Sequence, residues 1–210
     1  MEQLVSTEEM RLVDGLRAGD EAAFVELMRL YGGSMLRIAQ LYVRSRAVAE
    51  EVVQETWLAV LKGIDRFEGR SSLKTWLFRI LTNTAKTRAV REGRSVPFSA
   101  LAGDEEDGPS VDPDRFLGPD DRFPGHWSAP PSSWGAEPEE RLIASETLDV
   151  IKREIDRLPP AQALVITMRD VEGFTSDEVR NALDISETNQ RVLLHRARTK
   201  VRRALEEYLG

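Results

Sequence analysis

The sequence predicts an all-α protein with two small helical domains joined by a long acidic, proline-rich linker. Apolar residues recur at the spacing of a buried helix face through residues 1–96 and again through 138–210. Residues 97–137 hold most of the ten prolines and most of the net negative charge, and no helix or strand period survives there. We therefore expect two domains, 1–96 and 138–210, with a flexible linker between them.

Four apolar stripes and a capping signal predict the helices of the first domain. Ser6 followed by Glu9 fits a capping box, in which each side chain accepts a hydrogen bond from the other residue's backbone amide. Trp57 and Trp76 lie on the stripes, so we expect both in the core. We expect a separate helix for each stripe, and the stripes span residues 24–31, 35–42, 49–61 and 73–81.

Proline and capping residues divide the second domain. Pro160 is placed to start a helix after the preceding one has ended, because proline lacks the N–H that a helix interior requires. Thr175 and Glu178 form a second capping box, and Ser186 is suited to cap the last helix. The first helix of this domain is expected to bury one face containing Leu142, Leu148, Ile151, Ile155 and Leu158.

The net charge of −7 argues at first against a nucleic-acid partner, but it is unevenly spread. Residues 99–140 contain eleven acids and two arginines, whereas residues 1–98 carry a net charge of +2 and residues 141–210 have twelve bases and twelve acids. The acidity therefore belongs to the middle of the chain, and both predicted domains are close to neutral.

The chain has no cysteine and two histidines, which excludes disulfides and thiolate metal sites and leaves too few ligands for a zinc site. It has no glycine-rich phosphate loop and no nucleophile elbow, so we expect neither an enzyme nor a bound cofactor or metal. No apolar run is long enough to span a membrane, and the N-terminus has no basic region followed by an apolar stretch, so we expect no signal peptide. We expect a cytoplasmic protein without membrane insertion.

The last helix is the most informative segment. From Arg191 to Arg203 it carries six Lys or Arg and no acid. A short capped helix and a tight turn precede it, which is the layout of a helix-turn-helix that places its second helix in the DNA major groove. A solvated basic helix is the alternative for the charge alone, but the capped helix and turn favour DNA binding. The candidate DNA-contacting residues, at its start and on the face opposite the apolar stripe, are Ser186, Thr188, Arg191, Val192, His195 and Arg196.

Two surfaces of the first domain allow more than one interpretation. Around the third stripe, Leu58 is expected on the exposed side beside Glu51 and Glu55, which suits a protein contact; a scattered surface leucine is the alternative. On the fourth helix, a polar and basic stripe beside a loop is suited to following a DNA backbone and holding an unstacked base, and an ordinary solvated face is the alternative. This stripe contains Thr75, Arg79, Asn83 and Lys86.

Five strings in this chain resemble, in the same order, the extracytoplasmic-function sigma factors, which are promoter-specificity subunits of bacterial RNA polymerase in the sigma-70 family. The strings are AEEVVQETW at 49–57, FEGRSSLKTWLFRI at 67–80, LPPAQ at 158–162, RDVEG at 169–173 and HRAR at 195–198. The resemblance covers nearly the whole chain apart from 97–137. It implies a region 2 helical bundle, a linker and a region 4 helix-turn-helix domain.

The resemblance also implies a role for each surface. Glu51, Gln54, Glu55 and Leu58 would bind core RNA polymerase, and the segment 175–203 would read the −35 promoter element as duplex DNA. The melted −10 element would be captured by Arg70, Ser71, Ser72, Thr75, Arg79, Asn83 and Lys86. An anti-sigma factor is the expected regulatory partner. The alternative function is a free-standing helix-turn-helix repressor or activator, which binds promoter DNA without polymerase.

The chain departs from the family pattern within the helix-turn-helix. Asp184 stands where the family usually has a turn glycine, and because Asp tolerates a positive φ better than most residues, we expect the turn to survive. Gln190 falls on the core-facing stripe of the last helix, where an apolar residue is usual. Arg180 replaces a small residue in the preceding helix. These changes bear on the promoter sequence that is recognised, and we expect the fold to hold.

Overall fold

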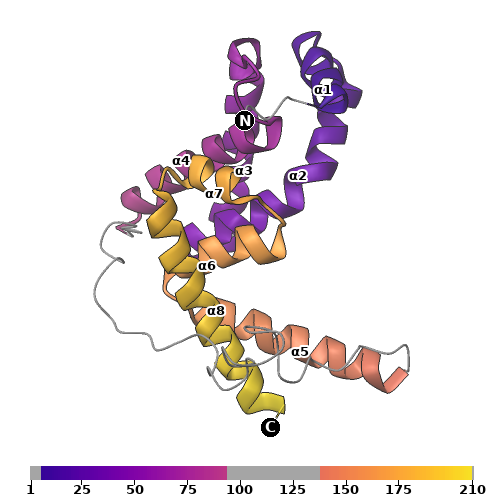
Figure 1. Ribbon diagram of the computed structural model, residues 1–210. Coiled ribbons are helices and arrows are strands. Elements are labelled where there is room, and N and C mark those ends of the chain that lie inside the picture. The colour runs from indigo at the N-terminus through magenta and orange to yellow at the C-terminus, as the bar shows by residue number, and fades with distance from the viewer. Residues whose placement is uncertain (1–5, 94–137, 210) are drawn as a thin grey trace, which may run out of the picture.

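The computed structural model describes residues 6–93 and 138–209, and the regular elements in these ranges are all helical (Figure 1). The first domain consists of α1 (Thr7–Arg17), α2 (Glu21–Tyr42), α3 (Arg46–Gly63), a 3₁₀ turn (Ile64–Arg66) and α4 (Leu73–Arg91). The second consists of α5 (Pro138–Arg157), α6 (Pro160–Ile166), a π-helical turn (Thr167–Val171), α7 (Ser176–Leu183) and α8 (Glu187–Leu209). The predicted all-α fold is confirmed, and the predicted linker 97–137 lies outside the described residues.

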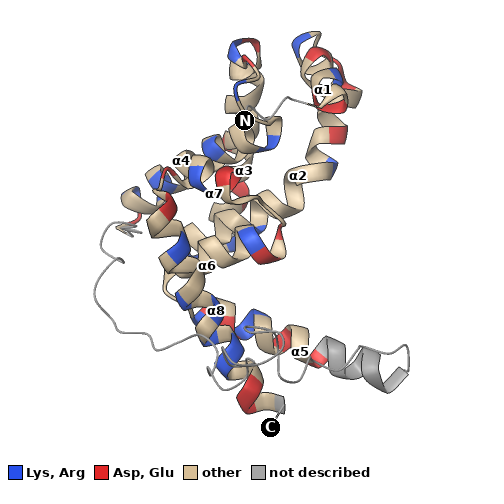
Figure 2. Cartoon of the chain, viewed as in Figure 1, with Lys and Arg blue, Asp and Glu red and all other residues tan. Residues whose placement is uncertain are grey.

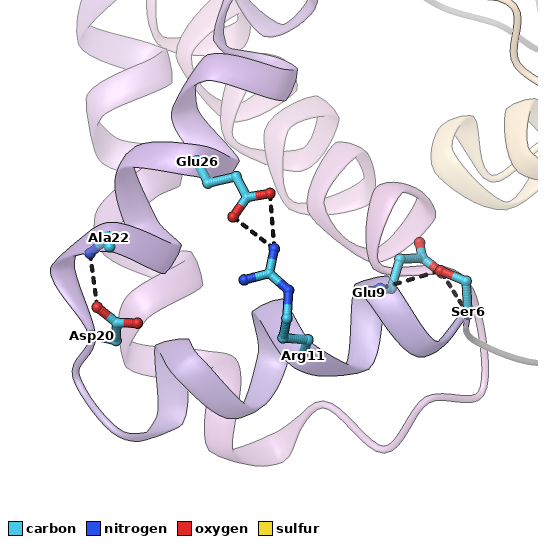
Figure 3. Close-up of polar contacts among 6 residues, drawn as sticks. All are labelled: Ser6, Glu9, Arg11, Asp20, Ala22 and Glu26. Atoms are coloured by element: carbon cyan, nitrogen blue, oxygen red, sulfur yellow. Dashed lines mark hydrogen bonds and ion pairs between the residues drawn. The ribbon is translucent and has the colours of Figure 1, made fainter.

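Short-range polar contacts set the starts of α1 and α2 (Figure 3). The predicted capping box of α1 is present: the Glu9 amide donates to Ser6 Oγ, and the Ser6 amide donates to a Glu9 carboxylate oxygen, both at 3.1 Å. Asp20 caps α2 by accepting a hydrogen bond from a backbone amide at 2.9 Å. An ion pair between Arg11 and Glu26, at 2.7 Å, joins the two helices. Such exposed pairs contribute about 1 kcal/mol or less, so capping and burial hold this hairpin more than charge does.

α2 is one continuous helix through Gly32 and Gly33, so the expectation of two separate helices was wrong. Each glycine in a helix interior costs about 1 kcal/mol relative to alanine. On either side of the pair, Leu27 and Tyr42 are fully buried. Burying one large apolar side chain contributes about 1.5–3 kcal/mol, so the packing of both halves outweighs the glycine penalty.

The two tryptophans of the first domain pack against phenylalanines. Trp57 is 8% exposed, and its ring meets Phe24 edge-on with centroids 5.7 Å apart. Its predicted core position is confirmed. Trp76 is half-buried and packs against Phe67 with ring centroids 5.3 Å apart. Trp76 therefore lies at the edge of the core and not inside it.

α5 leaves part of its expected apolar face uncovered. Pro160 lies in the first turn of α6, as predicted, and Ile155 and Leu158 are buried. The prediction for Leu148 was wrong, because its side chain is 64% exposed. Toward its start α5 extends away from α6 (Figure 1). The side chain of Leu142 lies outside the described residues.

The two domains pack directly against each other. α6 and α7 lie beside α2 and α4 (Figure 1), and one cluster of buried side chains runs from the first domain into the second. Phe174, just before α7, is 1% exposed, and its ring meets Phe78 of α4 edge-on at a centroid distance of 4.8 Å. The sequence did not predict this relative placement, which joins the two domains through a shared core.

Candidate functional site

α7 and α8 form the predicted helix-turn-helix. The Glu178 amide donates to the Thr175 hydroxyl at 3.2 Å and the Thr175 amide donates to the Glu178 carboxylate at 2.8 Å, which confirms the capping box. Asp184 ends α7 in the left-handed conformation with φ 58°, so the turn survives without glycine, as predicted. Ser186 then caps α8 by accepting a hydrogen bond from the Asn189 amide at 3.1 Å.

α8 has a buried face and an exposed face. Leu193 and Ala197 are fully buried. Thr188, Arg191 and His195 are exposed and lie about one helical turn apart, so they form a row along the outer face. Ser186 is exposed at the helix start, and Val192 and Arg196 are half-buried at the edges of the row. Figure 2 shows basic residues repeating along α8, which gives this face both hydrogen-bonding groups and positive charge.

Gln190 lies on the buried face of α8, as the sequence predicted, and is 2% exposed. Ser176 of α7 donates a hydrogen bond from its hydroxyl to Gln190 Oε1 at 2.6 Å. Because an unpaired buried amide is unfavourable, this bond lets a polar residue occupy a position that usually holds an apolar one. It also connects the two helices of the motif directly.

A second connection holds α8 against the π-helical turn. Arg198 donates two hydrogen bonds to the Asp170 carboxylate, at 2.7 and 2.8 Å. This bidentate contact raises the pKa of the Arg198 guanidinium above its usual value. Asp170 and Arg198 belong to two of the family strings, but their pairing was not predicted. Because Arg198 is engaged by Asp170, its role is to hold α8 in place. The positive charge of the outer face comes from other basic residues.

The candidate protein-contact face on α3 is exposed, as expected. Glu51, Gln54, Glu55 and Leu58 all lie on the surface, and Leu58 is 57% exposed. Arg88 of α4 forms ion pairs with Glu51 and, at 3.7 Å, with Glu55. Sequence analysis missed this pairing. It fixes the two carboxylates beside the exposed leucine, so the face presents an apolar contact next to acidic groups.

The loop before α4 and the outer side of that helix hold the candidate −10 residues. Arg70 is exposed and paired with Glu68 of the same loop, and Ser71 is half-buried. Ser72 caps α4, and its hydroxyl lies 2.8 Å from that of Thr75, which is only 3% exposed. Arg79 and Asn83 are exposed, whereas Lys86 is half-buried. The structure therefore places part of the predicted stripe in solvent and part of it under other groups.

Lys86 of this stripe, and Thr82 beside it, are bound by groups of the second domain. Lys86 Nζ donates a hydrogen bond to the Leu183 carbonyl at 3.0 Å, and Thr82 Oγ1 donates to the Ala182 carbonyl at 2.7 Å. Burial lowers the pKa of Lys86 below its usual value. The last carbonyls of α7 thus accept hydrogen bonds from α4, an arrangement that no local sequence signal indicated.

Glu172 forms a further contact between the domains. It accepts hydrogen bonds from Ser34 Oγ and from Arg37 Nε of α2, both at 2.5 Å. The Glu172 side chain is 6% exposed. Burial alone would raise the pKa of this carboxyl, but the hydrogen bonds from Arg37 and Ser34 outweigh it, and the pKa lies below its usual value.

Two family models match this chain: Sigma-70 region 2 over residues 27–95 and Sigma-70, region 4 over residues 148–201, together more than half of the sequence. The ECF RNA polymerase sigma-E factors of Escherichia coli K12 and Salmonella typhimurium LT2 are each 29% identical over 195 residues, 90% of this chain and 90% of theirs. The RNA polymerase sigma-H factor of Pseudomonas aeruginosa is 26% identical over 206 residues, 98% of both chains. The chain belongs to the extracytoplasmic-function sigma factors of the sigma-70 family.

Two solved structures share the fold. CnrH in complex with the cytosolic domain of CnrY has a TM-score of 0.56 at 19% identity and covers 95% of this sigma factor and 97% of its own chain. RpoE in complex with the anti-sigma factor NepR from Bartonella quintana has a TM-score of 0.55 at 21% identity, over 87% and 96%. Among the described helices of this sigma factor, none is both long and apolar enough to cross a membrane. The protein is a transcription initiation factor that gives RNA polymerase its promoter specificity, not a free-standing repressor.

Proposed function

We propose that this sigma factor divides its work among the three surfaces described above. α8 reads the −35 element, α4 with the loop before it captures the melted −10 strand, and α3 binds core RNA polymerase. The observation that carries the proposal is the outer row of α8, where Thr188, Arg191 and His195 stand exposed on a helix held by a capped helix and a tight turn.

The −35 assignment is supported by the chemistry of that row. An arginine, an imidazole and a hydroxyl on one helix face supply donors and acceptors that match base edges in the major groove. Val192 at the edge adds an apolar contact suited to a thymine methyl. Ser186 at the helix start and Arg196 at the edge of the row would reach the phosphates beside the groove. The pairing of Arg198 with Asp170 keeps the helix in place while the row stays exposed.

The −10 assignment is supported by the exposed part of α4. Arg79 and Asn83 lie about one turn apart on the outer side, with Arg70 and Ser71 in the loop beside the helix start. A guanidinium group suits a phosphate or an unstacked base, and an amide suits a base edge. Ser72, Thr75 and Lys86 complete the assigned set, although they are less exposed in this arrangement.

The polymerase assignment is supported by the exposed leucine and its acidic neighbours. Leu58 is more than half exposed, and Glu51, Gln54 and Glu55 surround it with groups that form hydrogen bonds and ion pairs. An apolar anchor with a polar rim is the usual composition of a protein interface. We assign this face to core RNA polymerase because the family acts as a polymerase subunit.

We also propose that an anti-sigma protein regulates this sigma factor. CnrH was solved in complex with CnrY, and RpoE with its anti-sigma factor NepR. By the same analogy, the protein acts in the cytoplasm beside core polymerase and the chromosome. It acts by binding and carries out no reaction of its own.

Transcription in vitro tests the function. Core RNA polymerase is incubated with the full-length protein and a library of promoter fragments, and the transcripts are sequenced. We expect transcripts that start at a fixed distance from shared −35 and −10 sequences. The matched variant Arg191→Ala should change the enriched −35 sequence and leave the −10 sequence unchanged. Random starts, or no retention of the protein by core polymerase, would refute the proposal.

A further inference from the structure

We propose that the packing of the two domains seen here is an inhibited state, in which the end of α7 occupies part of the DNA-binding surface of α4. The proposal rests on the assignment of α4 to the −10 strand. It adds that the free protein regulates this surface itself, by docking its second domain on the first.

The contacts at the end of α7 resemble those of a nucleic-acid backbone. Thr82 and Lys86 donate hydrogen bonds to the carbonyls of Ala182 and Leu183, the last two residues of α7. The final carbonyls of a helix have no partner within it and carry the negative end of the helix dipole. The adjacent Asp184 adds a full negative charge that acts on Lys86. Negative acceptors thus face the same donors that a phosphate would approach.

The docked position is fixed at two further points. Phe174 packs edge-on against Phe78, and Lys74 Nζ lies 3.7 Å from the centroid of the Phe174 ring. At the other edge, the buried Glu172 carboxylate accepts hydrogen bonds from Ser34 and Arg37. An aromatic contact with α4 and an ion pair with α2 define one orientation of the second domain on the first.

Docking divides the candidate −10 residues into two groups. Arg79 and Asn83 remain exposed, whereas Lys86 donates a hydrogen bond to the last carbonyl of α7. The hydroxyl of Ser72 also donates to Glu178 of α7 at 3.3 Å. A DNA strand that follows the whole stripe must displace α7. The apparent affinity of the free protein for that strand is therefore reduced by the fraction of molecules in the open state.

Reversing the charge of the edge contact should open the protein. The variants are Glu172→Arg, Arg37→Glu, and the double variant that restores the pair with its charges exchanged. The wild-type chain has no cysteine, so Val25→Cys and Leu148→Cys, at exposed positions in the two domains, place one fluorophore on each. Energy transfer between them reports docking in the full-length protein. We expect lower transfer in both single variants and recovery in the double variant.

Binding of DNA is measured on the same proteins with a fluorescein-labelled pool of single-stranded DNA of random sequence. We expect Glu172→Arg to bind about tenfold tighter than wild type, which corresponds to a wild-type open fraction of about one tenth, and the double variant to return toward wild type. Glu50→Arg is the matched control, because it makes the same change in net charge at an exposed pair with Arg46, away from the domain interface.

Each outcome supports or overturns the proposal. Unchanged energy transfer in the charge reversals, or equal tightening by Glu50→Arg, overturns it. Opening without a gain in DNA binding also overturns it, and Asn83→Ala then shows what has failed. If Asn83→Ala still weakens promoter opening by the holoenzyme, the −10 assignment stands and the inhibition is wrong. If Asn83→Ala has no effect, the −10 assignment itself is wrong.

Discussion

Replacing Phe174 with alanine tests how strongly the two domains share one core. The side chain is 1% exposed, meets Phe78 edge-on at 4.8 Å and lies 3.7 Å from Lys74 Nζ. Truncating a buried phenylalanine costs about 3–5 kcal/mol in lost transfer free energy and residual cavity. The aromatic pair accounts for about 0.5–1.5 kcal/mol of this and the cation–π contact for about 0.5–1 kcal/mol. Both contacts cross the domain interface, so about 1–2.5 kcal/mol of the loss should fall on docking.

Two assays separate these contributions. Urea unfolding followed by circular dichroism gives the total loss of unfolding free energy, and energy transfer between the domains gives the loss of docking. Phe24→Ala is the matched control, because Phe24 packs edge-on against Trp57 entirely within the first domain. We expect Phe24→Ala to lower stability without changing energy transfer. A loss below about 1 kcal/mol for Phe174→Ala, or unchanged energy transfer, would refute the shared core.

Replacing Glu55 and Leu58 together with alanine should abolish retention by core RNA polymerase while the circular dichroism spectrum stays that of wild type; unchanged retention would contradict the α3 assignment. Arg191→Ala should weaken holoenzyme binding at a preferred promoter by about 1–3 kcal/mol in a footprinting titration, and an equal loss on every DNA sequence would make it a phosphate contact. Asp184→Gly should preserve the melting temperature whereas Asp184→Ala should destabilise by about 1 kcal/mol, because alanine tolerates a positive φ poorly; equal melting temperatures would argue against strain at this turn. Acid should undock the domains. The pKa of Glu172 is held below its ordinary value. Glu172 therefore contributes fully to docking above its ordinary pKa, and this contribution is lost as the pH falls through the lowered pKa. Energy transfer should follow this loss, and a Glu172→Gln variant that shows the same pH dependence would assign the effect to another group.

Features that depend on neighbours in sequence could be predicted. The capping boxes at Ser6 and Thr175 need residues three positions apart, and the positive φ of Asp184 follows from one turn position. The burial of Gln190 follows from helix periodicity alone, although its partner Ser176 does not. The expectation of two helices in place of α2 was wrong, because the two apolar stripes were taken as separate helices although burial on both sides of the glycine pair keeps one helix continuous.

Features that depend on distant parts of the chain could not be predicted in the same way. On α4 the periodicity correctly placed Arg79 and Asn83 on an exposed side, but it gave no sign that Lys86 would meet α7. That contact joins residues 97 positions apart and ends on a backbone carbonyl, which carries no side-chain signal. The polar stripe was therefore found from the sequence, and its partial coverage required the structure.

The string RDVEG at 169–173 shows how one short motif can serve two separate purposes. Gly173 takes a positive φ of 67°, which its residue type suits. Asp170 binds Arg198, 28 residues later and within the same domain, whereas Glu172 binds Arg37, 135 residues earlier and across the domain interface. The sequence presents these five residues as one motif, but Asp170 and Glu172 bind partners in different domains. A change at Asp170 should loosen α8 within its own domain, while a change at Glu172 should alter docking and leave the helix-turn-helix intact. Because the two residues are so close in sequence, a difference between their effects must come from their partners and not from the local backbone.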